Sequence, residues 1–419
     1  MLSLSCLGVL SGSCVANKLE DAAEQRLLGE TTINTAGLGV TLYPGTILGA
    51  DESARTLSTR LNAGVGQLVL DTNERASGVF EVTIENVHKE AQLEVRLVET
   101  LPFGAGLDNI CSLETDRVAI NCASSPDDAK CQPLAFERPN DTTITASLPL
   151  DPCLKVTYDL SLPESARASD TSFVVIGSTR SPDTLDAIIS AERSAGREHD
   201  FYILLGDALD GKDNAAVDAL ISRTRALDEV FIAIPGAEEL GADSGLYFAQ
   251  HFGDFAYHWS MKQTQFVSFY SARRQLTTRG LINLESSLRA METEDRAWRT
   301  QNNYTLPDDE VRALPAFAIT HTPPFDPSSQ RERGFTSRIE AAQAMSLLGE
   351  YAIDTLFAGG MIDTASIDST PHLRVTTAQD TRINDLAEYI LVELSHAPFE
   401  GSRPLGNQHI KLTHTPLPQ

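Results

Sequence analysis

The spacing of apolar residues changes near residue 172, and this change constrains the fold more than any other feature of the chain. Before it, apolar residues alternate or cluster over strand lengths, as in Phe80-Glu81-Val82-Thr83-Ile84. After it, short apolar runs such as Phe173-Val174-Val175-Ile176 alternate with helical patterns such as residues 214–227. Runs of strands build sandwiches or barrels, whereas alternating strands and helices build layered α/β domains. The sequence therefore predicts two domains of different class.

The first of these, residues 30–163, is predicted to be an all-β sandwich of immunoglobulin-like outline. Strand-sized runs recur at regular spacing, with Gly, Pro, Asn and Asp between them. The strict alternation over residues 80–84 is typical of an antiparallel strand with one buried face. The polar stretch 162–171 is interpreted as a linker, and the segment before it contains no cluster of catalytic residue types.

The second domain, residues 172–419, is predicted to be a layered α/β domain whose strands end in glycine or polar residues. Ligands in open α/β sheets bind beyond the carboxyl ends of the strands, so these turns are expected to meet at one rim. The turns are Gly177-Ser178-Thr179-Arg180, Gly206-Asp207-Ala208-Leu209-Asp210, Gly236-Ala237-Glu238-Glu239, His321-Thr322-Pro323-Pro324 and Gly359-Gly360-Met361-Ile362.

The order of these five motifs resembles that of the calcineurin-like metallophosphoesterases, the family that includes the purple acid phosphatases. That family carries D-x-H, G-D-x-x-D, G-N-H-[ED], a later histidine before a Pro-rich turn, and G-H-x-H. The resemblance extends over residues 172–395 and includes the stretch 247–259. It implies a metallophosphoesterase fold that is preceded, as in purple acid phosphatases, by a sandwich. It also implies two divalent metals that activate a water and clamp phosphoryl oxygens.

Most of the metal ligands that the resemblance implies are absent. Asp207 matches the metal-bridging carboxylate and His321 matches a metal-binding imidazole, so two of seven ligands survive, with Asp210 as a further residual position. A dication needs a filled coordination shell, and we therefore expect no intact catalytic site and no bound cofactor. The family's other ligands, and the histidine that assists its leaving group, are replaced here by Ser178, Arg180, Ala237, Glu238, Gly360 and Ile362.

Arg180 stands where the family has a metal-binding histidine. A guanidinium repels a dication but forms charge-assisted hydrogen bonds with carboxylates. Without a metal, a buried Asp207 would need another counter-charge. We therefore predict a salt bridge between Arg180 and Asp207, with Asp210 or Glu238 as the other possible partners of the arginine.

Two other functions of the same region stay open. One is a residual phosphoester hydrolase that holds one divalent metal (Mn, Fe or Zn) through Asp207, His321 and Asp210, helped by Glu238 or Glu239. The other is recognition of a phosphate or sulfate at the helix start near Ser181. The anion would be held by Ser178, Thr179, Arg180 and Arg274.

Some of these motifs could also have a purely structural role. Asp207 could cap the turn that follows it, and His321 could be a satisfied loop histidine. Gly359-Gly360 could be an ordinary tight turn after a buried strand.

The cysteines favour an oxidising compartment. All six lie in the first 153 residues, and the last four form no C-x-x-C pair and have no nearby histidine, which argues against zinc. Four cysteines allow three sets of two disulfides, of which we favour Cys111–Cys122 with Cys131–Cys153. The alternative is four reduced, buried thiols.

The N-terminal sequence predicts where the protein is located, and the net charge limits the partners it can bind. Residues 1–29 resemble the tail of a bacterial lipoprotein signal followed by a tether, with Cys14 as the lipidated residue, although no basic segment precedes it. We expect an exported protein, either a periplasmic or outer-membrane lipoprotein anchored through Cys14 or a secreted protein. No transmembrane helix is expected, since no segment is long and apolar enough. A net charge of −25 argues against nucleic acid as a partner.

Overall fold

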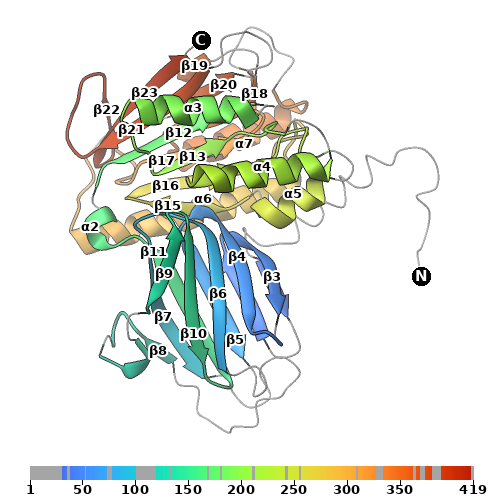
Figure 1. The fold of residues 1–419 in the computed structure, drawn as a ribbon. Helices are drawn as coiled ribbons and strands as arrows, with labels where there is room; N and C mark the ends of the chain where they lie inside the picture. Colours follow the sequence, from blue (N-terminus) through green and yellow to red (C-terminus); the bar gives the residue numbers. More distant parts are fainter. Residues whose placement is uncertain are drawn as a thin grey trace, which may run out of the picture.

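The fold was analysed in a computed structural model, drawn in Figure 1. The chain has an N-terminal part made of strands and a C-terminal part that also contains helices, and the two parts are in contact. The structure describes residues 31–34, 38–51, 53–72, 78–100, 119–125, 127–131, 134–167, 169–179, 182–209, 213–240, 244–253, 256–307, 310–326, 334–361, 365–368, 373–379 and 388–416.

The N-terminal part, residues 31–161, forms two sheets. One has the order β1 (Thr31–Asn34), β2 (Leu38–Tyr43), β5 (Gly66–Thr72), β11 (Leu154–Ser161), β7 (Gln92–Thr100) and β8 (Ala119–Asn121). The other has the order β3 (Gly45–Asp51), β4 (Thr56–Gly64), β6 (Gly78–Val87), β10 (Thr143–Leu150) and β9 (Phe136–Asn140). The 3-10 turn η2 (Ala129–Cys131) follows β8.

Strand β6 carries the alternation that the sequence analysis singled out. Phe80, Val82 and Ile84 are buried in the core, and the residues between them are more exposed. The strand pairs antiparallel with β10 but parallel with β4, so the prediction of a purely antiparallel strand is wrong on that side. The alternation reports which face of a strand is buried, and it does not report the direction of the neighbouring strand. The immunoglobulin-like outline and the domain boundaries stay predictions.

The C-terminal part, residues 169–416, contains two mixed six-stranded sheets. The first has the order β14 (Phe231–Ala233), β13 (Phe201–Leu204), β12 (Thr171–Ile176), β21 (Glu388–Ser395), β23 (Gln408–Pro416) and β22 (Arg403–Leu405). The second has the order β15 (His258–Met261), β16 (Thr264–Ser268), β17 (Ala316–Thr320), β18 (Thr355–Met361), β20 (Arg374–Gln379) and β19 (Ala365–Asp368).

Helices cover the outer faces of these two sheets. The first sheet is covered by α3 (Pro182–Ser194), α4 (Asn214–Leu227) and α5 (Ser244–Phe252), the second by α6 (Thr278–Asn302) and α7 (Arg338–Glu350). Along β12, Phe173 and Val175 face the second sheet, while Val174 and Ile176 face the helices. Both faces of this strand are therefore buried, which explains its uninterrupted apolar run. The predicted layered α/β class is confirmed.

The two parts share one continuous core and a polar interface. Residues of both parts belong to the same buried cluster. At the interface, the side-chain amide of Asn86, in β6, donates to the carbonyl of Phe231 at 2.9 Å and accepts its N–H at 2.8 Å. Asp228, after α4, accepts the N–H of Thr142 at 3.1 Å and its hydroxyl at 2.8 Å. These contacts fix the N-terminal part to the edge strand β14 of the first sheet. The short helix α2 (Glu164–Arg167) lies between the two parts in sequence.

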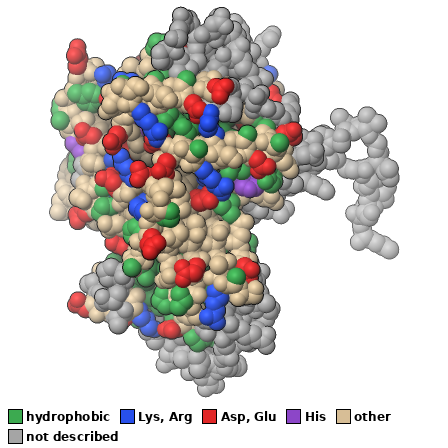
Figure 2. Space-filling view, viewed as in Figure 1, with side chains coloured by type: hydrophobic (Ala, Val, Ile, Leu, Met, Phe, Trp, Pro, Cys, Tyr) green, Lys and Arg blue, Asp and Glu red, His purple; other side chains and the backbone are tan. Residues whose placement is uncertain are grey.

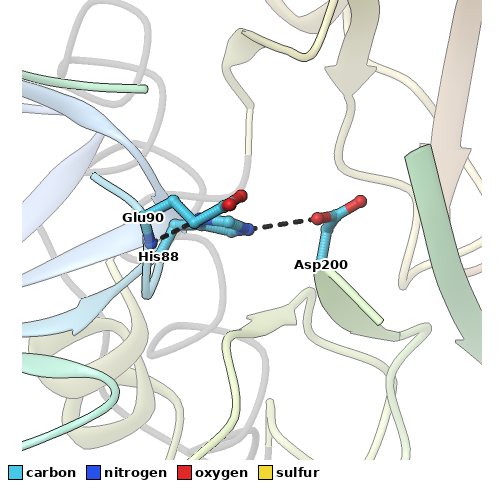
Figure 3. Close-up of side chains that lie close together, drawn as sticks. All are labelled: His88, Glu90 and Asp200. Atoms are coloured by element: carbon cyan, nitrogen blue, oxygen red, sulfur yellow. Dashed lines mark hydrogen bonds and ion pairs between the residues drawn. The ribbon is translucent and has the colours of Figure 1, made fainter. Parts of the chain in front are cut away.

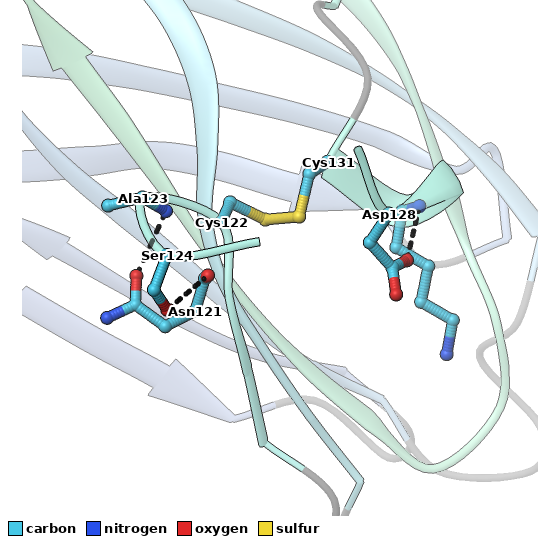
Figure 4. Close-up of a disulfide and its surroundings, with 7 residues drawn as sticks. Asn121, Cys122, Ala123, Ser124, Asp128 and Cys131 are labelled. Carbon is cyan, nitrogen blue, oxygen red and sulfur yellow. Dashed lines mark hydrogen bonds between the residues drawn. A yellow bond between two sulfur atoms is a disulfide. The ribbon is translucent and has the colours of Figure 1, made fainter. Parts of the chain in front are cut away.

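The disulfide pairing differs from the prediction. Cys122 is bonded to Cys131, nine residues away (Figure 4), and not to Cys111. Cys153 is also in a disulfide, so the alternative of four reduced thiols is wrong as well. Two tight turns explain the short loop, because Asn121 accepts the N–H of Ala123 and Asp128 accepts the N–H of Lys130. Cys6, Cys14 and Cys111 lie outside the described residues.

Glu192, near the end of α3, is a fully buried carboxylate that ties this helix to the first sheet. Arg197 donates to both of its oxygens, at 2.6 and 2.7 Å, and Nε2 of His199 lies 2.9 Å from Oε2. Tyr389, in β21, donates to Oε1, and Ser172, in β12, shares a hydrogen bond of 2.7 Å with Nδ1 of His199. Burial alone would raise the pKa of Glu192, but the donors outweigh it and lower this pKa to about 2.

We expect this carboxylate to make the stability of the chain fall between about pH 4.5 and pH 2. The ordinary pKa of the group is 4.5, and the folded value is about 2, so its stabilisation is complete above pH 4.5 and is lost as the pH falls. The gap corresponds to about 3 kcal/mol. Thermal unfolding followed by circular dichroism over this range should show a shallower pH dependence for Glu192→Gln. Glu292→Gln, on the exposed face of α6, should keep the pH dependence of the unmodified chain. An unchanged slope in Glu192→Gln would contradict the prediction.

Candidate functional site

The turns after β13, β14 and β17 meet strand β18 around the imidazole of His321. A Cβ atom on Gly206 would lie 2.7 Å from Nδ1 of this ring, and one on Gly236 would lie 2.7 Å from Cε1. A Cβ atom on Gly360 would lie 3.1 Å from Nε2. Side chains at these positions would collide with the ring or crowd it, so the glycines of three motifs form the slot that holds His321.

His321 is held in a defined orientation. It is 5% exposed, and its Nδ1 lies 2.7 Å from the carbonyl oxygen of Leu205. A carbonyl only accepts, so Nδ1 carries a proton, and in the neutral ring Nε2 is left as an acceptor. Nε2 lies 3.9 Å from Oδ2 of Asp207. The two ligand positions that survive from the family pattern therefore lie side by side, and both side chains are buried.

Asp207 links the second motif to the third. Its backbone has a φ of 53°, in the left-handed region that non-glycine residues seldom adopt. Its Oδ1 accepts the N–H of Glu238 at 2.9 Å. The carboxylate thus bonds to the backbone of another motif.

Glu239 occupies the acidic last position of the third motif and is completely buried. Burial and the nearby charge of Asp207 raise its pKa, while bonds from backbone N–H groups oppose the rise. Each carboxylate oxygen accepts two backbone N–H groups, so the side chain anchors two loops. From the sequence this residue was expected only as a possible metal ligand, and its structural role was not predicted. The four donors are the N–H groups of Asp207, Ala208, Leu209 and Gly236, at 2.7, 2.6, 3.2 and 2.7 Å.

Some of the positions at which the family's ligands are replaced lie within the described residues. Ser178 is fully buried, Ala237 is exposed and Glu238 is half-buried. Gly360, at a φ of 67°, lies with Gly359 inside β18, where the pairing with β20 shifts register. The interpretation of this pair as an ordinary turn is therefore wrong, because the chain makes a bulge within a strand.

Three of the predicted site residues, Arg180, Asp210 and Ile362, lie outside the described residues, so the salt bridge between Arg180 and Asp207 stays a prediction. Thr179 of the predicted anion site is buried. Nε of Arg274 in the same predicted site donates to the carbonyl of Gly334 at 3.0 Å. This bond ties the arginine to a neighbouring loop.

A polar cluster that was not predicted from the sequence lies between the two parts of the chain. His88 and Glu90 follow β6, and Asp200 precedes β13 (Figure 3). One ligand atom from each lies within 4.8 Å of the others, and this is the only group of three metal-ligand side chains in the described ranges. No sequence signal marks it, since His88 and Asp200 are 112 residues apart.

An ammonium group already lies at this cluster. Nζ of Lys262 is 2.6 Å from Oδ1 of Asp200, and Nε2 of His88 is 3.2 Å from the same oxygen. Nδ1 of His88 accepts the N–H of Glu90 at 3.1 Å, so Nε2 carries the proton of the neutral ring and donates to Asp200. A metal bound to these three side chains would have to displace Lys262. The contacts suit a buried ion pair between the two parts of the chain.

No family model and no curated protein matches the chain. Solved structures do match. A dimetal phosphatase from Danio rerio is 10% identical, with a TM-score of 0.42, over 59% of this chain and 98% of that chain. GAP50, the anchor in the inner membrane complex of Plasmodium, is 13% identical, with a TM-score of 0.40, over 59% and 85%.

A third match is the zinc complex of Vps29 from Entamoeba histolytica, which is 9% identical, with a TM-score of 0.27, over 59% of this chain and 100% of that chain.

The surface and the helices bear on partners. No helix in the described part of the chain is long and apolar enough to cross a membrane. On the face shown in Figure 2, acidic side chains are interspersed with Lys and Arg rather than gathered in one patch. The described residues on this face therefore form no large patch of a single charge sign.

Proposed function

We propose that the chain is an exported, catalytically inactive relative of the metallophosphoesterases that acts as a binding or structural module. The observation that carries the proposal is that the described residues supply few metal ligands around Nε2 of His321. Asp207 lies beside this atom, but the family's other ligand positions nearby include a glycine, Gly360, and an exposed alanine, Ala237. A two-metal centre needs more donors than these residues offer.

Glu239 does not make up for the missing ligands. Its two oxygens already accept four backbone N–H groups, so binding a metal would break hydrogen bonds in a fully buried place. The residues described at this site therefore do not fit the two-metal group of the family. The disulfide Cys122–Cys131 supports export, because such bonds persist in oxidising compartments.

A residual hydrolase with a single metal is the second candidate function. It is favoured by the orientation of His321, whose Nδ1 proton is held by the carbonyl of Leu205 and whose Nε2 lies 3.9 Å from Asp207. A metal-binding histidine commonly donates its other ring N–H to such a carbonyl. One divalent ion (Mn, Fe or Zn) could be held there if further ligands were present.

Metal content and hydrolysis test the proposal together. We expect the purified chain to contain substoichiometric Mn, Fe and Zn by mass spectrometry. We also expect no hydrolysis of bis(p-nitrophenyl) phosphate above the level of Asp207→Asn, with or without added Mn²⁺, because two ligands do not hold a dinuclear centre. Stoichiometric metal, together with turnover that is lost in Asp207→Asn, would reject the inactive module in favour of the hydrolase.

A further inference from the structure

A groove lined by both polar and apolar side chains lies between the N-terminal part and the side of α6. It has a volume of about 1010 Å³ and is lined by residues of β5, β7, β11, α2, β15 and the second half of α6. In Figure 1, α2 and α6 lie above the end of β11 at this place. None of the residues around His321 lines the groove. Binding sites of small molecules are often found between domains and have volumes of this order.

Several charged side chains of the groove are already paired with protein groups. Arg96 lies 3.6 Å from Asp159, and Arg167 donates to the carbonyl of Leu162 at 2.5 Å. Glu294 accepts the hydroxyl of Ser260 at 2.7 Å. Charges that are paired in this way attract an ionic ligand only weakly. The groove therefore suits a neutral ligand better than a phosphate or another anion.

The groove is also lined by aromatic rings and side-chain amides. Both tryptophans of the chain line the groove, Trp259 from β15 and Trp298 from α6. Trp298 is half-buried, and its ring lies 5.5 Å from that of Tyr304. The side chains of Gln92 and Gln301, on opposite walls, are exposed. Aromatic faces pack against the C–H faces of sugar rings, and amides both donate to and accept from hydroxyls.

We propose that this groove binds a neutral oligosaccharide and that Trp298 is the ring on which a sugar stacks. The proposal does not depend on whether the site at His321 is active, because the two sites share no residue. The paired charges favour a neutral ligand over an ionic one, and the exposed amides beside an aromatic ring favour a polar ligand over a purely apolar one.

Tryptophan fluorescence provides a direct test, since both reporters lie in the groove. We expect saturable changes in the emission of the full chain on titration with at least one of four neutral probes: cellohexaose, xylohexaose, maltohexaose and chitohexaose. Trp298→Ala should weaken the binding by about tenfold or more, with Trp259 as the remaining reporter. Trp298→Phe keeps an aromatic ring and should retain more of the affinity than Trp298→Ala.

Ile339→Ala is the matched control, because this exposed α7 residue lies outside the groove and should bind as the unmodified chain does. Circular dichroism checks that each variant is folded. The proposal is overturned if none of the four oligosaccharides gives saturable binding, or if Trp298→Ala binds as tightly as Ile339→Ala. Saturation by a neutral Gly-Ser hexapeptide and by no oligosaccharide would also overturn it and assign the groove to peptides.

Discussion

Replacing Glu239 by alanine should lower the stability of the chain by about 4 kcal/mol. The carboxylate is completely buried and accepts N–H groups from the loops after β13 and β14. Without it, four buried donors lose their partner at once, and each unsatisfied donor costs about 1 to 3 kcal/mol before the loops relax. Urea unfolding followed by circular dichroism measures the change.

Glu238 is the matched control for this substitution. It has the same charge and is adjacent in sequence, but it is half-buried and uses its backbone N–H, not its carboxylate, to bond Asp207. Glu238→Ala should therefore cost less than about 1 kcal/mol. Glu239→Gln should lie between the two, because its amide N–H₂ cannot accept. Equal losses in Glu238→Ala and Glu239→Ala would show that the four hydrogen bonds do not stabilise the fold.

The sequence predicts those features of the fold that depend on neighbours along the chain. Helix α4 is predicted at residues 214–227 and is found at Asn214–Leu227, where Asp213 caps its first turn by accepting the N–H of Ala216. The layered arrangement follows from apolar runs such as that of β12, because such a run needs both faces of a strand covered. Periodicity and capping are local signals, and they reported the C-terminal part correctly.

Contacts between residues that are distant in the sequence could not be predicted from these local signals. The pairing of Cys122 with Cys131 depends on two turns, and spacing alone left three connectivities open. The motif pattern placed Glu239 correctly in its loop, but only the folded chain shows that its carboxylate meets the backbone of Ala208 and Leu209. A motif identifies which residues share a site and does not say which bonds they form there.

The buried ion pair between Asp200 and Lys262 lies where the two parts of the chain meet, and its loss should lower the stability strongly. Asp200→Ala should destabilise the chain by about 3 kcal/mol, because the buried Lys262 would lose its carboxylate partner at 2.6 Å and keep only Glu90, at 3.9 Å. It would also remove the acceptor of His88 and of the Ser172 N–H, at 3.2 and 3.0 Å. Burial raises the pKa of Asp200, but these donors and the charge of Lys262 outweigh it and lower the pKa below its ordinary value. The carboxylate is therefore charged at neutral pH and needs its partners.

The interface itself provides the control. Lys89 and Glu198 form an ion pair of 2.5 Å across the same two parts of the chain, but the side chain of Glu198 is 83% exposed. Glu198→Gln should change the unfolding midpoint very little, since exposed pairs contribute about 1 kcal/mol or less. Treatment with EDTA should leave the midpoint of the unmodified chain unchanged, because Lys262 already supplies the positive charge beside Asp200. A drop in midpoint on EDTA treatment that is still seen in Asp207→Asn would mean that a metal ion, and not the ammonium group, holds His88, Glu90 and Asp200 together.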